Sequence, residues 1–122
     1  MTVGRRIWAI AEGYIPSGGL EGDSALVSHE TACILNAQEV DVNLRITLYF
    51  ADREPVGPYC MPVLARRTLH LRFNDLSDPE PVPRDTDFAV VLEADAPVVV
   101  QHTRLDSRHQ NISLLSTIAF SE

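Results

Sequence analysis

Lysine is absent from this 122-residue sequence, and all ten of its basic residues are arginine. This absence excludes mechanisms that need a lysine, either as a Schiff-base former or as the phosphate-binding residue of a P-loop. Seventeen acidic residues stand against the ten basic ones, so the net charge is -7. Because a net negative charge repels the phosphate backbone, we do not expect nucleic acid as a partner.

Cysteine is scarce, and long apolar runs are missing. Cys33 and Cys60 are the only cysteines and form no C-x-x-C pair, so we expect two reduced thiols, as in cytoplasmic proteins. The apolar run after Arg6 is broken by Glu12 and Gly13, which makes it too short for a signal peptide or for the roughly 20 residues of a membrane span. We therefore predict a cytoplasmic protein that reaches the inner face of a membrane only through a partner.

Motifs of catalysis and metal binding are also missing. Neither G-x-S-x-G nor S-x-x-K occurs, and the glycines do not form a phosphate-binding loop. No two histidines show the H-x-H or H-E-x-x-H spacing that places metal ligands on one face. We therefore expect no metal, no cofactor and no enzymatic activity.

Apolar residues that recur with a period of two are the main pattern present. This alternation is clearest at residues 42–50 and 67–73, and it is typical of half-buried strands. Segments rich in β-branched and aromatic residues predict further strands at 6–11, 30–36, 59–64, 88–94, 98–103 and 114–120. Pro62 restricts the strand at 59–64 to the edge of a sheet or interrupts it.

Proline and glycine are concentrated between these strands, at residues 14–23, 51–58 and 74–87, which we predict to be loops. Seven or eight short strands without a convincing helix predict an all-β fold, a single β-sandwich or jelly-roll domain over residues 1–122. The edge strands of such a sandwich must be covered, charged or paired with another subunit. We therefore expect a homo-oligomer.

One predicted strand changes from apolar to polar at its end, where Gln101, His102 and Arg104 follow three valines. Amide, imidazole and guanidinium groups form directional hydrogen bonds, so this strand end suits a pocket or interface for a polar ligand or a carboxylate. In the alternative interpretation, Arg104 pairs with Asp106 or Asp75 and its neighbours satisfy the sheet edge. Both interpretations stay open at this point.

Two other strands carry groups of interest. His29 and Glu30 are adjacent and so point to opposite faces, which argues against a dyad and favours a structural role, such as Glu30 bonding an arginine of a neighbouring strand. Trp8, the only tryptophan, precedes Glu12 and could stack on a sugar ring, although packing in the core or between subunits is the favoured interpretation.

Six collinear segments form a pattern from about Gly4 to Phe120. They are WAIAEGYIP at 8–16, SHET at 28–31, EPVGPY at 54–59, RFNDL at 72–76, DTDFA at 85–89 and VQHTRLDSR at 100–108, the last followed by LLST at 114–117. Together they resemble the Anabaena sensory rhodopsin transducer family. The likeness is weakest at residues 17–25 and 109–111, and loops commonly carry partner specificity.

The resemblance implies a small cytoplasmic β-sandwich protein that assembles as a tetramer and has no enzymatic activity. It also implies association with the cytoplasmic side of a light-sensing membrane rhodopsin, although members of the family could serve other receptors. Binding of small molecules such as sugars has been proposed for the family. DNA binding has been suggested too, but the charge of -7 argues against it here.

We therefore expect a non-enzymatic oligomeric adaptor that relays a signal between a membrane receptor and a cytoplasmic output, gated by a small polar ligand. The expected ligand-binding residues are Trp8, Glu12, Arg72, Gln101, His102 and Arg104. The alternative is a small-molecule-binding module, for a carbohydrate, that has no rhodopsin partner.

Overall fold

A computed structural model describes residues 2–20, 22 and 25–122 of the chain. The described residues form eight β-strands and one short 3₁₀-helix, which confirms the predicted all-β fold. The elements are β1 (Arg5–Gly13), β2 (His29–Asn36), β3 (Val42–Phe50), β4 (Val56–Val63), β5 (Arg67–Arg72), η1 (Phe73–Asp75), β6 (Phe88–Asp106), β7 (Ser113–Ile118) and β8 (Phe120–Ser121).

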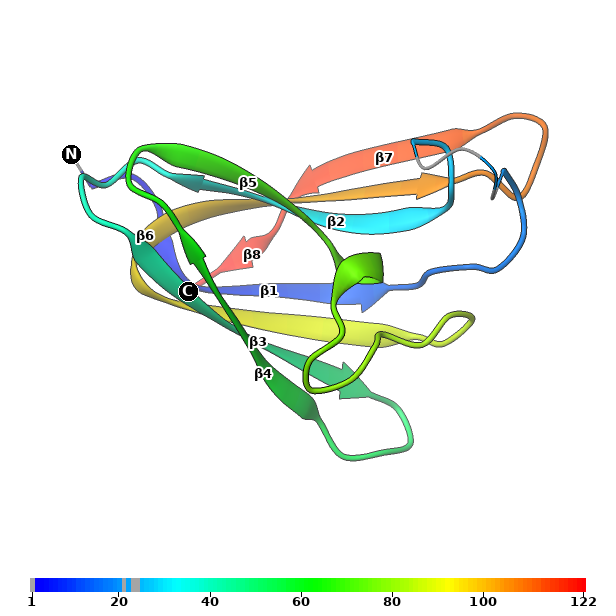
Figure 1. The fold of residues 1–122 in the computed structure, drawn as a ribbon, viewed down its shortest axis with the longest axis horizontal. Coiled ribbons are helices and arrows are strands. Elements are labelled where there is room, and N and C mark those ends of the chain that lie inside the picture. The colour runs from blue at the N-terminus through cyan, green and yellow to red at the C-terminus, as the bar shows by residue number, and fades with distance from the viewer. Residues whose placement is uncertain (1, 21, 23–24) are drawn as a thin grey trace.

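The strands form an antiparallel sheet that folds over into two layers (Figure 1). The first layer has the strand order β4-β3-β6-β1-β8. In the second layer, β5 pairs with β2, β2 with β6, and β6 with β7. β6 therefore belongs to both layers, because its first half pairs with β1 and β3 and its second half with β2 and β7.

The prediction of two separate strands at 88–94 and 98–103 is wrong, because both belong to the continuous strand β6. Pro97 lies inside this strand, where a residue without an N–H group would normally break the ladder. However, the ladder with β3 ends at Ala94 and the ladder with β2 begins at Val99. Pro97 falls between the two ladders, at the place where β6 bends from one layer into the other.

The core lies between the layers and contains alternate residues of facing strands. Fully buried members include Leu44, Ile46 and Leu48 of β3, Ala32 and Ile34 of β2, and Val98 and Val100 of β6. Each large aliphatic side chain buried in this way stabilises the fold by about 1.5–3 kcal/mol. The period of two in the sequence thus separates a core face from a solvent face.

One end of the core is closed by a glycine and two aromatic rings. A Cβ atom added to Gly13 would lie 2.5 Å from the ring of Phe88, so only glycine fits at this position without a shift. The Phe88 ring in turn packs edge to face against Phe73, with ring centroids 5.8 Å apart. This contact fixes the end of β1 against the start of η1 and of β6.

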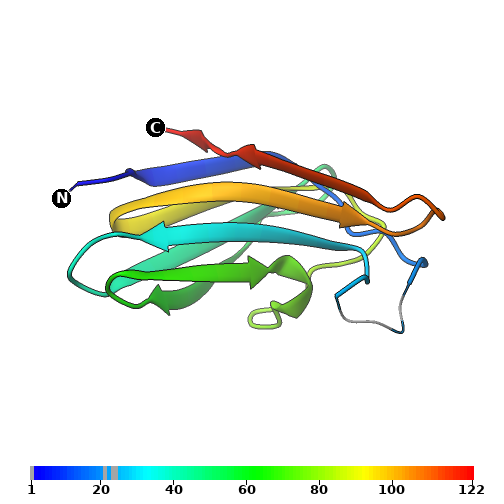
Figure 2. The same ribbon diagram turned by 90° about the horizontal axis from the view of Figure 1, so that it is seen from above.

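The prediction of one strand at 114–120 is also wrong, because the chain forms two strands there. β7 pairs with β6 in the second layer, whereas β8 pairs with β1 in the first layer. Between them Ala119 is buried and its backbone N–H donates a hydrogen bond to the Val100 carbonyl at 3.1 Å. The end of the chain therefore crosses from one layer to the other along one side of the sandwich (Figure 2).

The predicted loops agree with the structure in part. β4 begins at Val56, inside the predicted loop 51–58, and it forms an edge of the first layer as Pro62 indicated. In the predicted loop 14–23, residues Glu21 and Asp23 lie outside the described residues. The described part contains one isolated bridge, between Gly19 and Val27.

Candidate functional site

A carboxylate is buried inside the second layer, near the end of the polar strand. Glu30 of β2 shares the core face with Ala32 and Ile34, and its side chain is fully buried. In the β2–β6 ladder Glu30 lies directly opposite Arg104, and Ala32 lies opposite His102. Because residues two apart on a strand share a face, His102 and Arg104 both point towards this carboxylate.

Four donors reach the two oxygens of Glu30. Arg104 donates from Nε at 3.2 Å and from Nη2 at 2.9 Å, both to Oε2. The backbone N–H of Tyr14 donates to the same oxygen at 2.6 Å, and His102 Nε2 lies 2.8 Å from Oε1. A buried carboxylate is stable only when it is paired in this way.

Burial and hydrogen bonding act on Glu30 in opposite directions. Burial alone would raise the pKa of Glu30, but the hydrogen bonds from His102, Arg104 and the Tyr14 amide together lower that pKa below its ordinary value of 4.5. The same pairing raises the pKa of Arg104. Glu30 is therefore ionised at neutral pH and faces a permanent cation.

The ionised carboxylate also fixes the tautomer of His102. A carboxylate can only accept hydrogen bonds, so His102 Nε2 must carry the hydrogen that points to Glu30. In the neutral ring the other nitrogen, Nδ1, is then an acceptor. No hydrogen bond among the described residues uses Nδ1. Because no buried side-chain nitrogen or oxygen among these residues lacks a partner, Nδ1 is accessible from the surface.

A groove of about 260 Å³ opens beside this cluster, between β1 and the β7–β8 segment. Its polar members are Glu12, His102, Arg104 and Thr117. Its apolar members are Ala9, Ile10, Ala11, Leu115, Ile118, Ala119 and Phe120. At one end of the groove, Glu12 is exposed and its Oε1 lies 3.6 Å from Arg104 Nη1. A few converging polar groups in an apolar groove are typical of sites for small ligands.

Polar side chains from neighbouring segments hold the start of β2 in place. The side chain of Asn74 accepts a hydrogen bond from the Glu30 N–H at 3.3 Å and donates one to the Ser28 carbonyl at 3.0 Å. The hydroxyl of Ser28 accepts from the Ser107 N–H at 3.0 Å. These contacts fix the backbone of Glu30 relative to η1 and to the end of β6.

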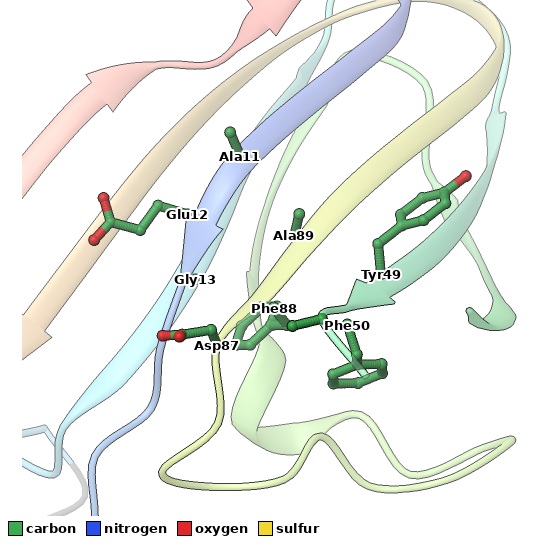
Figure 3. A pocket seen from close by; sticks show the side chains of 9 residues that line it. Ala11, Glu12, Gly13, Tyr49, Phe50, Asp87, Phe88 and Ala89 are labelled. Atoms are coloured by element: carbon green, nitrogen blue, oxygen red, sulfur yellow. The ribbon is translucent and has the colours of Figure 1, made fainter. Parts of the chain in front are cut away.

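A second hollow, of about 450 Å³, lies over the ends of β1, β3 and β6. Figure 3 shows Ala11, Ala89 and Tyr49 on these three neighbouring strands, with Glu12 pointing away from Tyr49. Its ionisable side chains are the carboxylates of Glu12 and Asp87 and the phenol of Tyr49. This hollow therefore lacks the converging donors and acceptors of the groove beside His102.

Of the six predicted site residues, the structure brings three together in the groove: Glu12, His102 and Arg104. Gln101 points to the opposite face of β6, where its amide donates to Ser116 Oγ at 2.8 Å. Arg72 pairs with Thr31 in the ladder, which places it on the face opposite Glu30. Trp8 is buried in the core, and its indole N–H points at the Val98 carbonyl at 3.0 Å.

The alternative prediction that Arg104 pairs with Asp106 or Asp75 is wrong. Arg104 pairs with Glu30, as the predicted structural role of Glu30 required, and not with Asp106 or Asp75. Asp106 instead accepts from Arg108 Nη2 at 2.6 Å.

Sequence reasoning left Glu30 out of the site, although a signal for it was present. The alternation in β2 places Glu30 on the same face as two apolar residues, Ala32 and Ile34, and a carboxylate on a core face requires a buried partner. Leu115 and Thr117 of the groove were missed because they lie opposite Arg104 and His102 only through the β6–β7 register.

Within residues 2–20, 22 and 25–122, no group of three or more His, Cys, Asp or Glu side chains could hold a metal ion. In the same part of the chain, no helix is both long and apolar enough to cross a membrane.

The geometry of this chain is shared by proteins of known structure. The Anabaena sensory rhodopsin transducer is 54% identical, with a TM-score of 0.74, over 84% of this chain and 99% of that chain. The crystal structure of Thermotoga maritima 1070 is 34% identical, with a TM-score of 0.86, over 98% of this chain and 96% of that one. No curated protein matches at a significant level. The family described as Anabaena sensory rhodopsin transducer matches residues 3–121, and the chain belongs to this family.

Proposed function

We propose that this chain is a non-enzymatic adaptor that relays a signal from a membrane rhodopsin, or a related receptor, to a cytoplasmic output. The observation that carries the proposal is the 54% identity to the Anabaena sensory rhodopsin transducer over 84% of the chain. In this role the protein works in the cytoplasm, and its receptor recruits it to the inner face of the membrane.

Receptor binding is tested by titrating the full chain into nanodiscs that hold a purified sensory rhodopsin, followed by calorimetry. We expect saturable heat with the rhodopsin and none with nanodiscs of the same lipid alone. A relay also requires that the two receptor states bind the adaptor with different affinity. The dissociation constant should therefore change on illumination, and equal constants in light and dark would contradict the relay.

We propose as well that the groove beside His102 holds a small polar ligand that gates the relay, with carbohydrates as the expected class. A sugar hydroxyl could donate to His102 Nδ1, and a neighbouring oxygen could accept from Arg104. Glu30 and Glu12 already pair with the charge of Arg104, which favours a neutral ligand over an anion. The apolar side chains of Leu115 and Phe120 suit the C–H face of a sugar ring.

The ligand is tested by a thermal-shift screen against sugars, nucleotides and metal salts. A ligand at 100 times its dissociation constant adds about 2.7 kcal/mol of stability. Arg104→Ala lowers the stability without ligand, because Glu30 loses its cation, but it should leave the oligomer intact and abolish the shift measured against the same variant without ligand. Arg108→Ala, which removes an exposed arginine, should keep the shift. Leu115→Trp narrows the groove without touching Glu30 and should also abolish the shift. If no compound of the panel raised the melting temperature, the proposal of a small polar ligand would be contradicted.

The second candidate function is a carbohydrate-binding module with no receptor. The groove beside His102 is the observation that favours this function. The two candidates differ in one outcome: a sugar-dependent shift without any heat from rhodopsin nanodiscs supports the module. For either function we expect a homo-oligomer, with a tetramer as the expected state. Light scattering at micromolar protein concentration measures this, and a monomer mass would contradict it.

A further inference from the structure

The outer face of the first layer carries a strip of small and apolar side chains. In the ladders of this layer, Val91 of β6 lies opposite Ala9 of β1 and Thr47 of β3. Ala89 of β6 lies opposite Tyr49 of β3. All five side chains are half-buried or exposed, and Tyr49 is 43% exposed. Contiguous exposed apolar surface commonly marks an interaction site.

The strip ends in the hollow of about 450 Å³ over β1, β3 and β6 (Figure 3). The carboxylates of Glu12 and Asp87 stand beside this hollow, and the turn after β3 adds those of Asp52 and Glu54. Asp52, Glu54 and Asp87 are exposed, and no hydrogen bond or ion pair from a described residue reaches their carboxylates. The hollow is therefore bordered by carboxylates that have no partner in the described part of the chain.

Arginines at this end of the sandwich are already paired with other carboxylates. Arg53 Nη2 lies 2.8 Å from Glu80 Oε1, and Arg108 Nη2 lies 2.6 Å from Asp106 Oδ2. Neither arginine is left to neutralise the carboxylates beside the hollow. A cation for these carboxylates must therefore come from another molecule.

Negative charge is concentrated at the same end of the molecule. Residues 51–55 and 74–87 include seven acidic and two basic residues. Both segments lie at the end where β1 and β3 finish and β6 begins (Figure 1). The net charge of the chain is -7, so these segments account for most of it. A surface lined by one sign of charge attracts a partner of the opposite sign.

The contacts of Arg53 indicate which cationic group suits this surface. Its guanidinium lies 4.9 Å from the centroid of the Phe50 ring while it pairs with Glu80. Phe50 and Tyr49 both line the hollow, and no described arginine lies over the Tyr49 ring. An aromatic ring beside unpaired carboxylates can bind a guanidinium or ammonium group in the same way.

We propose that the hollow and the adjoining strip dock a basic, amphipathic segment of a partner protein. Arginine or lysine side chains of the segment pair with the carboxylates of Asp52, Glu54 and Asp87. One of these cations stacks on Tyr49, and the apolar side chains of the segment cover the strip. An acidic segment would be repelled by the same carboxylates.

The expected source of this segment is a cytoplasmic loop of the receptor. Cytoplasmic loops of membrane proteins carry an excess of lysine and arginine, which complements the acidic end of this chain. The choice of the receptor as the source rests on the proposed function. The docking of a basic segment at the hollow does not depend on it.

The first test uses a short fluorescent peptide of alternating arginine and leucine at physiological salt. We expect a saturable change in anisotropy with the full chain, and none with a peptide of alternating glutamate and leucine. Asp87→Arg should weaken binding by roughly tenfold or more, because it places like charges in contact. The matched control is Glu39→Arg, the same change at an exposed residue between β2 and β3. Because salt screens distant charges, Glu39→Arg should weaken binding by about twofold at most.

Two outcomes of this titration would overturn the proposal. Equal losses for Asp87→Arg and Glu39→Arg would mean that the peptide responds to net charge alone. A wild-type chain that does not bind the peptide would mean that the hollow docks no basic segment. Far-ultraviolet circular dichroism should show that both variants keep the wild-type fold.

The ring of Tyr49 is tested by two substitutions at the same position. Tyr49→Ser removes the ring and should weaken peptide binding about threefold, as expected for a cation on an exposed aromatic face. Tyr49→Phe keeps the ring and should bind as wild type does. Equal affinity of Tyr49→Ser and wild type would contradict the stacking and the proposed surface with it.

The last test separates this proposal from the proposed function. Wild type, Asp87→Arg and Glu39→Arg are titrated into nanodiscs that hold the sensory rhodopsin. We expect Asp87→Arg alone to raise the dissociation constant by roughly tenfold or more. If Asp87→Arg bound as tightly as wild type, the assignment of the receptor to the hollow would be overturned. If wild type bound the peptide but gave no heat with rhodopsin, the proposed receptor would be wrong and the docking surface for a basic segment would stand.

Discussion

Glu30 and Arg104 lie directly opposite each other in the ladder between β2 and β6, and their side chains meet on the core face of the sheet. The carboxylate is fully buried, whereas the guanidinium side chain is 23% exposed beside the groove. Opposite charges at facing positions stabilise an antiparallel pair. This contact joins the start of β2 to the end of β6 and orients the Arg104 side chain beside the groove.

Replacing Glu30 by Gln should strongly destabilise the fold, because Arg104 would lose the partner that compensates its partial burial. We expect a loss of about 3 kcal/mol in the free energy of unfolding, measured by urea denaturation. Glu12→Gln is the control, since Glu12 is 84% exposed and 3.6 Å from Arg104, and should cost less than about 1 kcal/mol. Equal losses for both variants would contradict the role of the buried pair.

Stability should fall in acid because of the same carboxylate. The pKa of Glu30 is lower in the folded chain than its ordinary value of 4.5, so its contribution is complete above that pH and is lost as the pH falls through the folded pKa. Arg108 lowers the pKa of Asp106 to about 2, which extends the loss in the same direction. Urea denaturation between pH 6 and about pH 2 should show a steeper decline for wild type than for Glu30→Gln. If the stability of wild type and of Glu30→Gln fell equally with pH, the loss in acid could not be assigned to Glu30.

Ser28→Ala should leave a buried backbone donor without its acceptor. The Ser28 hydroxyl accepts from the Ser107 N–H at 3.0 Å, and both residues are buried. An unsatisfied buried donor costs about 1–3 kcal/mol, which thermal and urea unfolding can both resolve. Ser77→Ala, at an exposed serine, should change stability by less than about 0.5 kcal/mol. An unchanged free energy of unfolding in Ser28→Ala would show that another group accepts the hydrogen bond from the Ser107 N–H.

Gly13→Ala should destabilise the chain by forcing the Phe88 ring to move, because the new Cβ would lie 2.5 Å from it. Overpacking of this kind costs about 1–3 kcal/mol. A double-mutant cycle with Phe88→Leu checks the cause, since the smaller side chain should relieve most of the loss due to alanine. An equal loss in both backgrounds would place the strain elsewhere.

The strands were largely predictable because each half-buried strand carries its own alternation of apolar and polar residues. Residues 42–50 show this best, since the predicted segment and β3 have the same ends. What local pattern could not give is the path of β6 through Pro97. Proline normally ends a strand, and only the gap between the β3 and β2 ladders explains its place here.

The site was predictable only in part for a related reason. His102 and Arg104 stood out as polar residues at the end of an apolar strand, and alternation alone places Gln101 on the other face. The partner of Arg104 depends on the register between β2 and β6, two segments that are far apart in the sequence. No local pattern encodes that register, so Glu30 could be assigned to an arginine but not to this one.

The pairing of β1 has a consequence for the order of folding during synthesis. In the described structure β1 pairs only with β6 and β8, which the ribosome makes long after β1. β3 and β4 can pair as soon as both are made. β1 has no partner strand until β6 is made, so Trp8 and Ile10 stay exposed to solvent or to chaperones until then. Such late, long-range pairing is slow and favours aggregation. β1 is therefore made before the other described strands but is among the last of them to pair.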